Sequence, residues 1–168
     1  FAANPEIRMD VVDPDTCFNE NIYATYAVLE MMKLSNANTI VFASSSTVYG
    51  DAKIVPTTES YSPLEPISIY GASKLASEAL IASYCHSYSK NAVILRFANI
   101  VGARNKRGVV NDFIAKLKKN PTELVILGDG HQRKSYLYID DCTDAILKAS
   151  EASKERVAVF NIGSDDQI

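Results

Sequence analysis

Tyr70 and Lys74 are four residues apart at the start of a segment with helical apolar periodicity. This spacing places both side chains on one face of a helix. An ammonium beside a phenol favours the phenolate, so it lowers the pKa of a group that ordinarily titrates near ~10. The pair could therefore act as a general base near neutral pH. The spacing alone equally fits a half-buried tyrosine beside a solvated lysine, so the surrounding elements must decide.

Short apolar runs alternate with longer segments of helical periodicity, and this order predicts an α/β fold with parallel strands joined by right-handed crossovers. We expect helices at about 15–33, 69–88, 109–119 and 139–152, and strands at 39–43, 92–97, 124–127 and 157–162. Residues 51–66 are rich in Pro, Thr, Ser and Glu, which is typical of a surface excursion.

The composition is that of an ordinary globular protein, with 168 residues, 47% hydrophobic and 22% charged. A net charge of −3 without a basic face argues against nucleic acid as a partner. Cys17, Cys85 and Cys142 lie in segments that we expect to be helical, so we interpret them as buried free thiols rather than as a disulfide or metal site. Free thiols indicate a reducing, cytoplasmic setting. No apolar run approaches the roughly 20 residues that span a bilayer.

Polar side chains follow two of the predicted strands directly. The strand that ends at Ala43 leads into a cluster of hydroxyl residues at 44–47, and the strand that ends near Phe97 leads into Asn99. Ligands of open parallel sheets bind at the carboxyl ends of the strands. Serines also suit turns, so the cluster by itself has a structural interpretation as well.

Six motifs occur in an order that covers essentially the whole chain: Phe1-Ala2-Ala3, Asn21-Ile22-Tyr23-Ala24-Thr25, Ser44-Ser45-Ser46-Thr47-Val48-Tyr49-Gly50, Tyr70-Gly71-Ala72-Ser73-Lys74, Leu95-Arg96-Phe97-Ala98-Asn99 and Gly128-Asp129-Gly130-His131-Gln132. Together they resemble the extended short-chain dehydrogenases/reductases, within them the NAD-dependent epimerase/dehydratase family, and most closely its nucleotide-sugar epimerases of the UDP-glucose 4-epimerase type. The resemblance implies a Rossmann-like, doubly wound parallel sheet with a small substrate-binding subdomain, and NAD as cofactor.

The resemblance also implies catalytic roles for three residues. Tyr70 would be the base, Lys74 would bond the nicotinamide ribose and tune Tyr70, and Ser45 would contact the reacting sugar hydroxyl. The chemistry suits these residue types, because a phenolate can take the O4 proton while hydride leaves C4 for NAD. Rotation of the 4-keto sugar and return of the hydride to its other face would invert C4 of a UDP-hexose.

Further binding residues follow from the same resemblance. The cofactor side comprises Phe1, Ala2, Asn21, Tyr70, Lys74, Phe97 and Ala98. The substrate side comprises Ser45, Ser46, Thr47, Tyr70, Asn99, Val125, Leu127 and Lys134, with Asn99 at the diphosphate and the backbone of 125–127 at the uracil. Apart from the resemblance, Asn21 would be read as a surface helix residue and Phe97, Val125 and Leu127 as core. Lys134 stands where many relatives have an arginine, and lysine lacks the bidentate fork.

Other family chemistries and a different class of protein are open alternatives. Dehydratase relatives have an Asp-Glu pair at the positions of Ser46 and Thr47, which argues against dehydration here. A uronate epimerase or decarboxylase could use Arg104, Lys106 or Arg107 to bind a substrate carboxylate. A non-catalytic dinucleotide-binding regulator commonly loses the tyrosine or the lysine, and this chain has both. Asp140 and Asp141 fit the start of a helix better than a catalytic pair.

The glycine-rich Gly-x-x-Gly-x-x-Gly turn of the family, which holds the cofactor pyrophosphate, does not occur in the sequence. We therefore expect an internal fragment that is inactive alone. It would comprise residues 1–102 as part of the NAD-binding domain without its glycine-rich half, 103–137 as part of the substrate subdomain, and 138–168 as a return to the first domain. The two long helices near 15–33 and 69–88 resemble those through which relatives form homodimers.

Overall fold

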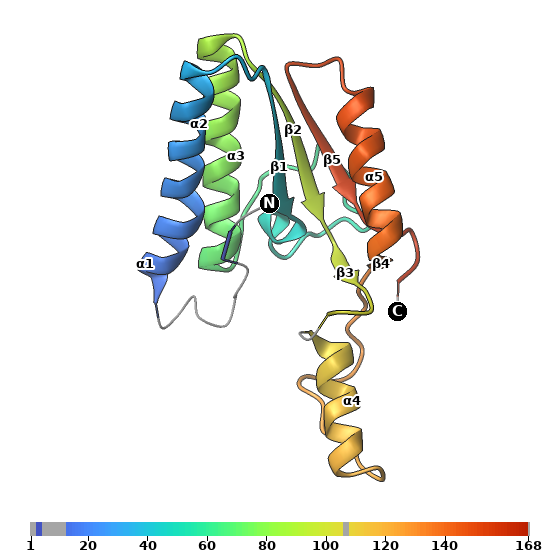
Figure 1. Cartoon of the computed structure of the whole chain (residues 1–168). Helices are drawn as coiled ribbons and strands as arrows, with labels where there is room; N and C mark the ends of the chain where they lie inside the picture. Colours follow the sequence, from blue (N-terminus) through green and yellow to red (C-terminus); the bar gives the residue numbers. More distant parts are fainter. Residues whose placement is uncertain (1–2, 5–12, 106–107, 168) are drawn as a thin grey trace.

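The computed structural model describes residues 3–4, 13–105 and 108–167. Its centre is a parallel sheet of β1 (Thr39–Ser45), β2 (Asn91–Phe97) and β5 (Val157–Ile162), in the order β1-β2-β5. Helices α2 (Ala24–Leu34) and α3 (Ile69–Tyr88) cover one face of this sheet, and α5 (Ile139–Ala152) covers the other (Figure 1). The predicted α/β class with parallel strands is confirmed.

The strands of this sheet are apolar on both faces because helices bury both of them. On one face, Ala92 and Ile94 of β2 pack with Leu29 of α2 and Ile81 of α3. On the other face, alternate residues of the same strand pack against α5. This explains why the predicted strands read as continuous apolar runs, and it places the carboxyl ends of all three strands at one edge of the sheet (Figure 1).

The helix that we expected near 15–33 is present but contains an irregular turn. It begins as α1 (Pro14–Cys17), where the Asp13 side chain accepts a hydrogen bond from the Thr16 N–H and proline occupies the first helical position. A π-helical segment, η2 (Phe18–Tyr23), then joins α1 to α2. Periodicity does not reveal a π-turn, and such turns occur frequently at functional sites.

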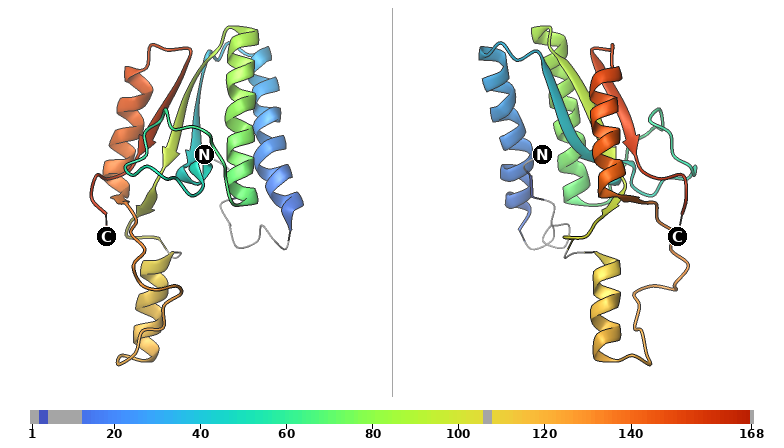
Figure 2. Two further views of the ribbon diagram at one scale, coloured as in Figure 1. Left: turned by 180° about the vertical axis from the view of Figure 1, so that it is seen from behind. Right: turned by 45° about the vertical axis from the view of Figure 1, so that its right-hand side comes forward.

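The remaining elements lie near the carboxyl edge of the sheet. A 3₁₀ helix, η3 (Ser46–Tyr49), follows β1 directly, and residues 51–66 form the expected irregular excursion. The short strands β3 (Asn99–Val101) and β4 (Tyr136–Tyr138) form a separate parallel pair. Helix α4 (Val109–Lys119) projects beyond this pair, away from the main sheet (Figures 1 and 2).

The strand predicted at 124–127 is wrong. These residues are neither helix nor strand, and Leu127 is 88% exposed. A strand needs a neighbour to satisfy its backbone groups, and the carbonyl of Val125 instead accepts a hydrogen bond from Lys116 Nζ of α4 at 2.7 Å. The short apolar run therefore lies along α4 as coil. The strands β3 and β4 were not predicted, because three-residue strands have little periodicity of their own.

All three cysteines are buried and free of disulfide bonds, as expected. Within the described ranges, no helix combines the length and the apolar character that crossing a membrane requires.

Candidate functional site

The hydroxyl cluster at the end of β1 forms the start of η3. Ser45 is the N-cap of this 3₁₀ helix, and its Oγ accepts hydrogen bonds from the Thr47 N–H at 3.2 Å and from Thr47 Oγ1 at 2.9 Å. A serine hydroxyl has two acceptor sites and one donor. Because Thr47 uses the acceptor sites, Ser45 can offer its own O–H to a ligand oxygen. Ser46 is exposed.

Helix α3 begins immediately beside this cluster. The Ser68 side chain caps α3 by accepting a hydrogen bond from the Gly71 N–H at 3.0 Å. A Cβ at Gly71 would lie 2.9 Å from the carbonyl oxygen of Thr47 and 3.0 Å from the side chain of Pro66. Glycine therefore permits the first turn of α3, which carries Tyr70, to approach η3 closely.

Lys74 connects α3 to the end of β1. Its Nζ donates a hydrogen bond to the Ala43 carbonyl at 3.0 Å and lies 5.1 Å from the centroid of the Phe42 ring and 5.6 Å from that of Tyr70. The lysine is only 4% exposed, and burial lowers the pKa of its ammonium. The structure thus brings the ammonium against the Tyr70 ring, as the spacing of four predicted.

Asn21 braces this region from η2. Its Oδ1 accepts a hydrogen bond from the Asn4 N–H at 2.9 Å, and its Nδ2 donates to the Asn4 carbonyl at 3.3 Å and to Ser73 Oγ at 3.0 Å. Ser73 Oγ in turn donates to the Tyr70 carbonyl at 2.7 Å. Asn21 is buried, so the interpretation as a surface helix residue is wrong. Sequence reasoning missed Ser73, although it lies inside the Tyr70 motif.

The last residue of β2 and the two residues that follow it lie at the same edge of the sheet. Phe97 packs against the cluster beneath α5. The Ala98 N–H donates to the Ile162 carbonyl at 2.8 Å. Asn99 is exposed, and its Nδ2 donates to the Ser135 carbonyl at 3.2 Å. Four residues named above, Phe1, Ala2, Lys106 and Arg107, lie outside the described residues.

The other predicted substrate residues lie beyond the sheet. Val125 and Leu127 belong to the coil that follows α4, and Lys134 is exposed in the segment that leads to β4. Figure 1 shows this coil beside α4. Asp140 and Asp141 lie in the first turn of α5, where negative charge suits the helix dipole. Neither carboxylate caps the helix by a hydrogen bond, since its N-cap is Tyr138.

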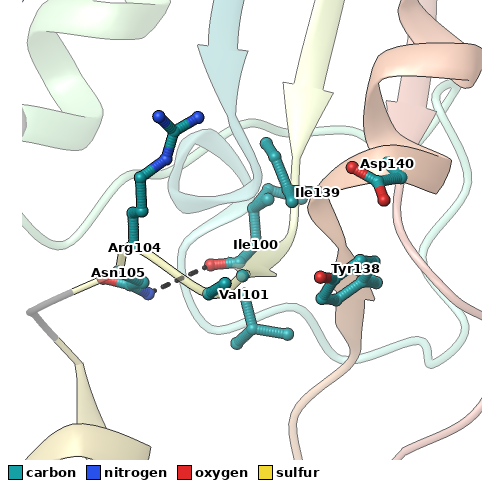
Figure 3. Close-up of a pocket in the computed structure, with 9 residues that line it drawn as sticks. Ile100, Val101, Arg104, Asn105, Tyr138, Ile139 and Asp140 are labelled. Carbon is teal, nitrogen blue, oxygen red and sulfur yellow. Dashed lines mark hydrogen bonds between the residues drawn. The ribbon is translucent and has the colours of Figure 1, made fainter.

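A cavity of about 430 Å³ lies where β3 and β4 meet the start of α5 (Figure 3). Arg104 and Asp140 contribute opposite charges to its wall, and Asn105 Nδ2 donates to the Ile100 carbonyl at 3.5 Å. Of the residues named from the sequence, it contains the candidate uronate-binding Arg104 but neither Tyr70 nor Lys74. Tyr70 and Lys74 therefore lie outside this cavity.

Comparison with known proteins matches residues 1–163 to the family described as "NAD dependent epimerase/dehydratase family". The chain belongs to this family. A UDP-glucose 4-epimerase of Corynebacterium glutamicum is 29% identical over 190 residues, which cover 99% of this chain and 55% of that protein. The chain thus spans about half the length of the curated relatives that it matches.

Solved structures of the epimerase/dehydratase family agree with this assignment. A crystal structure of UDP-galactose 4-epimerase has a TM-score of 0.90 and 45% identity, covering 100% of this chain and 56% of its own. A Bacillus cereus UDP-glucuronic acid 4-epimerase, solved with UDP-glucuronic acid and NAD, has a TM-score of 0.88 and 30% identity, covering 100% and 54%. The Rossmann-type fold and NAD as the cofactor of the family follow from these matches.

The described residues fit one part of NAD. The Lys74 ammonium has three donors, and one of them bonds the Ala43 carbonyl, so a buried cation at the carboxyl edge of the sheet can also serve ribose hydroxyls. The Asn21 amide bonds Asn4 and Ser73, so it supports the start of α3, and its predicted contact with the cofactor stays a prediction.

The close approach at Gly71 predicts an unusual effect of a Gly→Ala change in a helix. Alanine ordinarily stabilises a helix by about 1 kcal/mol relative to glycine. Here we expect Gly71→Ala to destabilise the complete protein by about 1–3 kcal/mol, because the new methyl group overlaps the Thr47 carbonyl. Urea unfolding measures this. The control is Ala72→Gly at the exposed neighbouring position, which should cost only the helix propensity, about 1 kcal/mol. Equal or greater stability of Gly71→Ala would contradict the packing argument.

Proposed function

We propose that the complete protein epimerises a UDP-hexose at C4, of the UDP-glucose/UDP-galactose type, through a 4-keto intermediate with Tyr70 as the base. The observation that carries this proposal is that the buried Lys74 ammonium lies close to both the Tyr70 ring and the Ala43 carbonyl, two residues before Ser45. Membership of the epimerase/dehydratase family supports the reaction class.

Each catalytic side chain has a defined task in this proposal. Tyr70 removes the proton from the C4 hydroxyl, and the positive charge of Lys74 stabilises the phenolate. Ser45 donates its O–H to the C4 oxygen, which stays hydrogen-bonded as the alcohol becomes a ketone. NAD, when bound, would accept the C4 hydride and, after the 4-keto sugar has rotated, return it to the other face of C4. Tyr70 then returns its proton to the C4 oxygen on the inverted centre.

We further propose the substrate contacts that the family likeness implies. Ser46 and Thr47 would lie beside the sugar, Asn99 and Lys134 beside the diphosphate, and the backbone at Val125 and Leu127 beside the uracil. Residues 103–137 would then be part of the substrate subdomain. A cytoplasmic location stays a prediction from the free thiols.

The substrate assignment is tested by incubating the complete gene product with NAD and each candidate sugar. The panel is UDP-glucose, UDP-galactose, their N-acetyl counterparts and UDP-glucuronate, with products separated by chromatography. We expect interconversion of the unmodified hexoses. Conversion of UDP-glucuronate alone would instead favour a uronate epimerase that uses Arg104, and no conversion with NAD bound would exclude the epimerase.

Replacing Tyr70 by phenylalanine removes the proton acceptor and keeps the ring. We expect kcat of Tyr70→Phe to fall by about 10²–10⁴-fold, the usual contribution of general acid–base catalysis. The matched control is Tyr138→Phe, at an exposed tyrosine outside the proposed site, which should retain full turnover. Full turnover by Tyr70→Phe would remove Tyr70 from the mechanism.

The lowered pKa of Lys74 predicts a specific pH profile. As pH rises, the ammonium loses its proton below the ordinary value of 10.5, and the stabilisation of the phenolate is lost with it. We expect the wild-type rate to decline on this alkaline side. Lys74→Met should be slow at pH 7, gain activity as pH rises because Tyr70 then ionises unaided, and lack the alkaline decline. A rate profile parallel to that of wild type would show that Lys74 does not tune Tyr70.

The outer faces of α2 and α3 support a homodimer. Tyr26, Val28, Met31 and Leu34 of α2 are all exposed, and Met31 is 72% exposed. Beside them, Tyr84 of α3 donates a hydrogen bond to Glu30 at 2.6 Å, which raises the pKa of Tyr84 to about 12. We propose that a second copy of the protein covers this face, because contiguous apolar side chains on two adjacent helices favour association.

We expect light scattering of the complete protein to give the mass of a dimer, and Met31→Glu to give the mass of a monomer. The control is Ile54→Glu, which places the same charge at an exposed apolar residue of the 51–66 excursion and should stay dimeric. A monomeric wild type would refute the assignment of this face.

A further inference from the structure

A row of polar side chains crosses the main sheet one residue before its three strands end. Ser44 of β1 is paired with Arg96 of β2, and Arg96 is paired with Asn161 of β5. Residues in register on parallel strands point to the same face. Earlier rows on this face, which α2 and α3 cover, carry apolar residues such as Ile94. Polar side chains therefore take the place of apolar core residues at the carboxyl end of the sheet, next to the proposed site.

Arg96 is the centre of a hydrogen-bonded network in this row. Its Nε and Nη2 donate to the two carboxylate oxygens of Glu78 at 3.1 and 2.7 Å, and its Nη1 donates to the Tyr49 phenol oxygen at 3.0 Å. Ser44 also donates to Glu78, and Tyr49 donates to Asn161 Oδ1 at 2.7 Å. Burial works to lower the pKa of Arg96, but the hydrogen bonds to Glu78 and Tyr49 outweigh it and raise that pKa.

The network also holds the 51–66 excursion. Arg96 Nη1 donates to the Glu59 carbonyl at 3.3 Å, and the Asn161 N–H donates to Glu59 Oε1 at 2.8 Å. Asn161 Nδ2 donates to the Thr57 carbonyl at 3.0 Å. The buried guanidinium of β2 thus bonds α3, η3 and the excursion, and Asn161 adds β5 to the same network.

Stability alone is a weak reason for such a network. Replacing a buried ion pair by well-packed apolar residues is often neutral or stabilising. The apolar contacts of Ile81 and Cys85 already hold α3 against the sheet, but hydrophobic packing is non-directional. A bidentate Arg96–Glu78 pair is directional, so it fixes where along β2 the helix sits.

The position of α3 matters because Glu78 lies on the same face of this helix as the catalytic candidates Tyr70 and Lys74. Tyr70, Lys74 and Glu78 follow one another at intervals of four residues on α3. Each residue rises about 1.5 Å, so Glu78 lies roughly 6 Å along the helix from Lys74. Lys74 bonds Ala43 while Glu78 bonds Ser44, the next residue of β1. Two successive points of the strand therefore hold two successive turns of the helix.

The other end of the network lies beside Ser45. Ser44 precedes it in β1, and Tyr49 ends the 3₁₀ helix that Ser45 caps. The Arg96 guanidinium lies 4.9 Å from the centroid of the Tyr49 ring in addition to its hydrogen bond to the phenol. Tyr49 is buried, so these contacts hold η3 on its buried side.

We propose that Ser44, Tyr49, Glu78 and Arg96 form a positioning network that sets Tyr70 against Ser45 for proton transfer. This inference rests on the proposed function, since it assigns a task within that reaction. The four residues support the site from the buried side and act through Tyr70 and Ser45. A misplacement of about 1 Å between reacting groups can reduce a rate by about 100-fold.

The test uses Ser44→Ala, Tyr49→Phe and Glu78→Gln in the complete protein with NAD. We expect kcat to fall by about 10-fold for the first two and about 100-fold for Glu78→Gln, with KM for the UDP-sugar within about 3-fold of wild type. The matched control is Ser150→Ala, which removes a serine hydroxyl that donates a hydrogen bond to a carbonyl of its own helix, α5, at 2.7 Å. It should leave kcat unchanged. Lower melting temperatures with unchanged kcat in the folded variants would show that the network is merely structural.

A second measurement does not depend on turnover. With ¹³Cζ-labelled tyrosine, the Tyr70 resonance is assigned by its absence from Tyr70→Phe, and its titration is followed by NMR. We expect the midpoint of the Tyr70 titration to move upward by at least about 0.5 pH unit in Ser44→Ala and Glu78→Gln. The reason is that a displaced α3 would hold the Lys74 ammonium farther from the Tyr70 phenol, so the phenolate would be less stabilised. Ser150→Ala should not move it. Unmoved midpoints would overturn the inference, whereas moved midpoints in a protein that converts no sugar would uphold the positioning and refute only the proposed reaction.

Discussion

The hydrogen bond from the buried Lys74 ammonium to the Ala43 carbonyl determines how the site is assembled. A buried ammonium is costly unless polar groups replace its hydration, and here a backbone oxygen and two aromatic faces do so. The contact forms where the start of α3 lies close to the end of β1 and to η3, and Gly71 permits the approach to η3. The charge that would activate Tyr70 therefore also holds the helix that carries it.

The main sheet buries apolar surface at one end of its strands and aligns the helix that carries the site at the other. Toward the amino ends of the strands, apolar residues on both faces supply most of the burial and tolerate small displacements of the helices. Toward the carboxyl ends, the row that contains Arg96 replaces this packing with directional hydrogen bonds. Helix α3 contacts both regions, so its carboxyl-terminal half contributes burial and its amino-terminal half contributes alignment.

Much of the architecture could be predicted from sequence because the apolar runs are long and the helices are capped. The expected helix at 69–88 coincides with α3, whose Ser68 cap is a local signal. The run 124–127 misled the prediction because a strand depends on a neighbour that no local pattern reveals. The buried network was missed for the same reason, although one signal was present. Arg96 interrupts an apolar strand of otherwise buried residues, and a charge there requires a partner.

The π-helical turn between α1 and α2 affects how the amino-terminal helix can change. In an α-helix, each residue turns the chain by about 100° about the helix axis. A π-turn contains one residue more per turn, so the π-helical segment η2 changes the direction in which the side chains of α2 point relative to Cys17 of α1. Asn21 lies within this turn and bonds toward α3, whereas the exposed apolar side chains of α2, such as Met31 and Leu34, point outward. Substitutions on the outer face can therefore accumulate without disturbing the inner contact. Adding or removing a residue in this turn would rotate α2, and it would displace both the inner contact with α3 and the outer apolar side chains. The length of the segment is therefore more constrained than its composition.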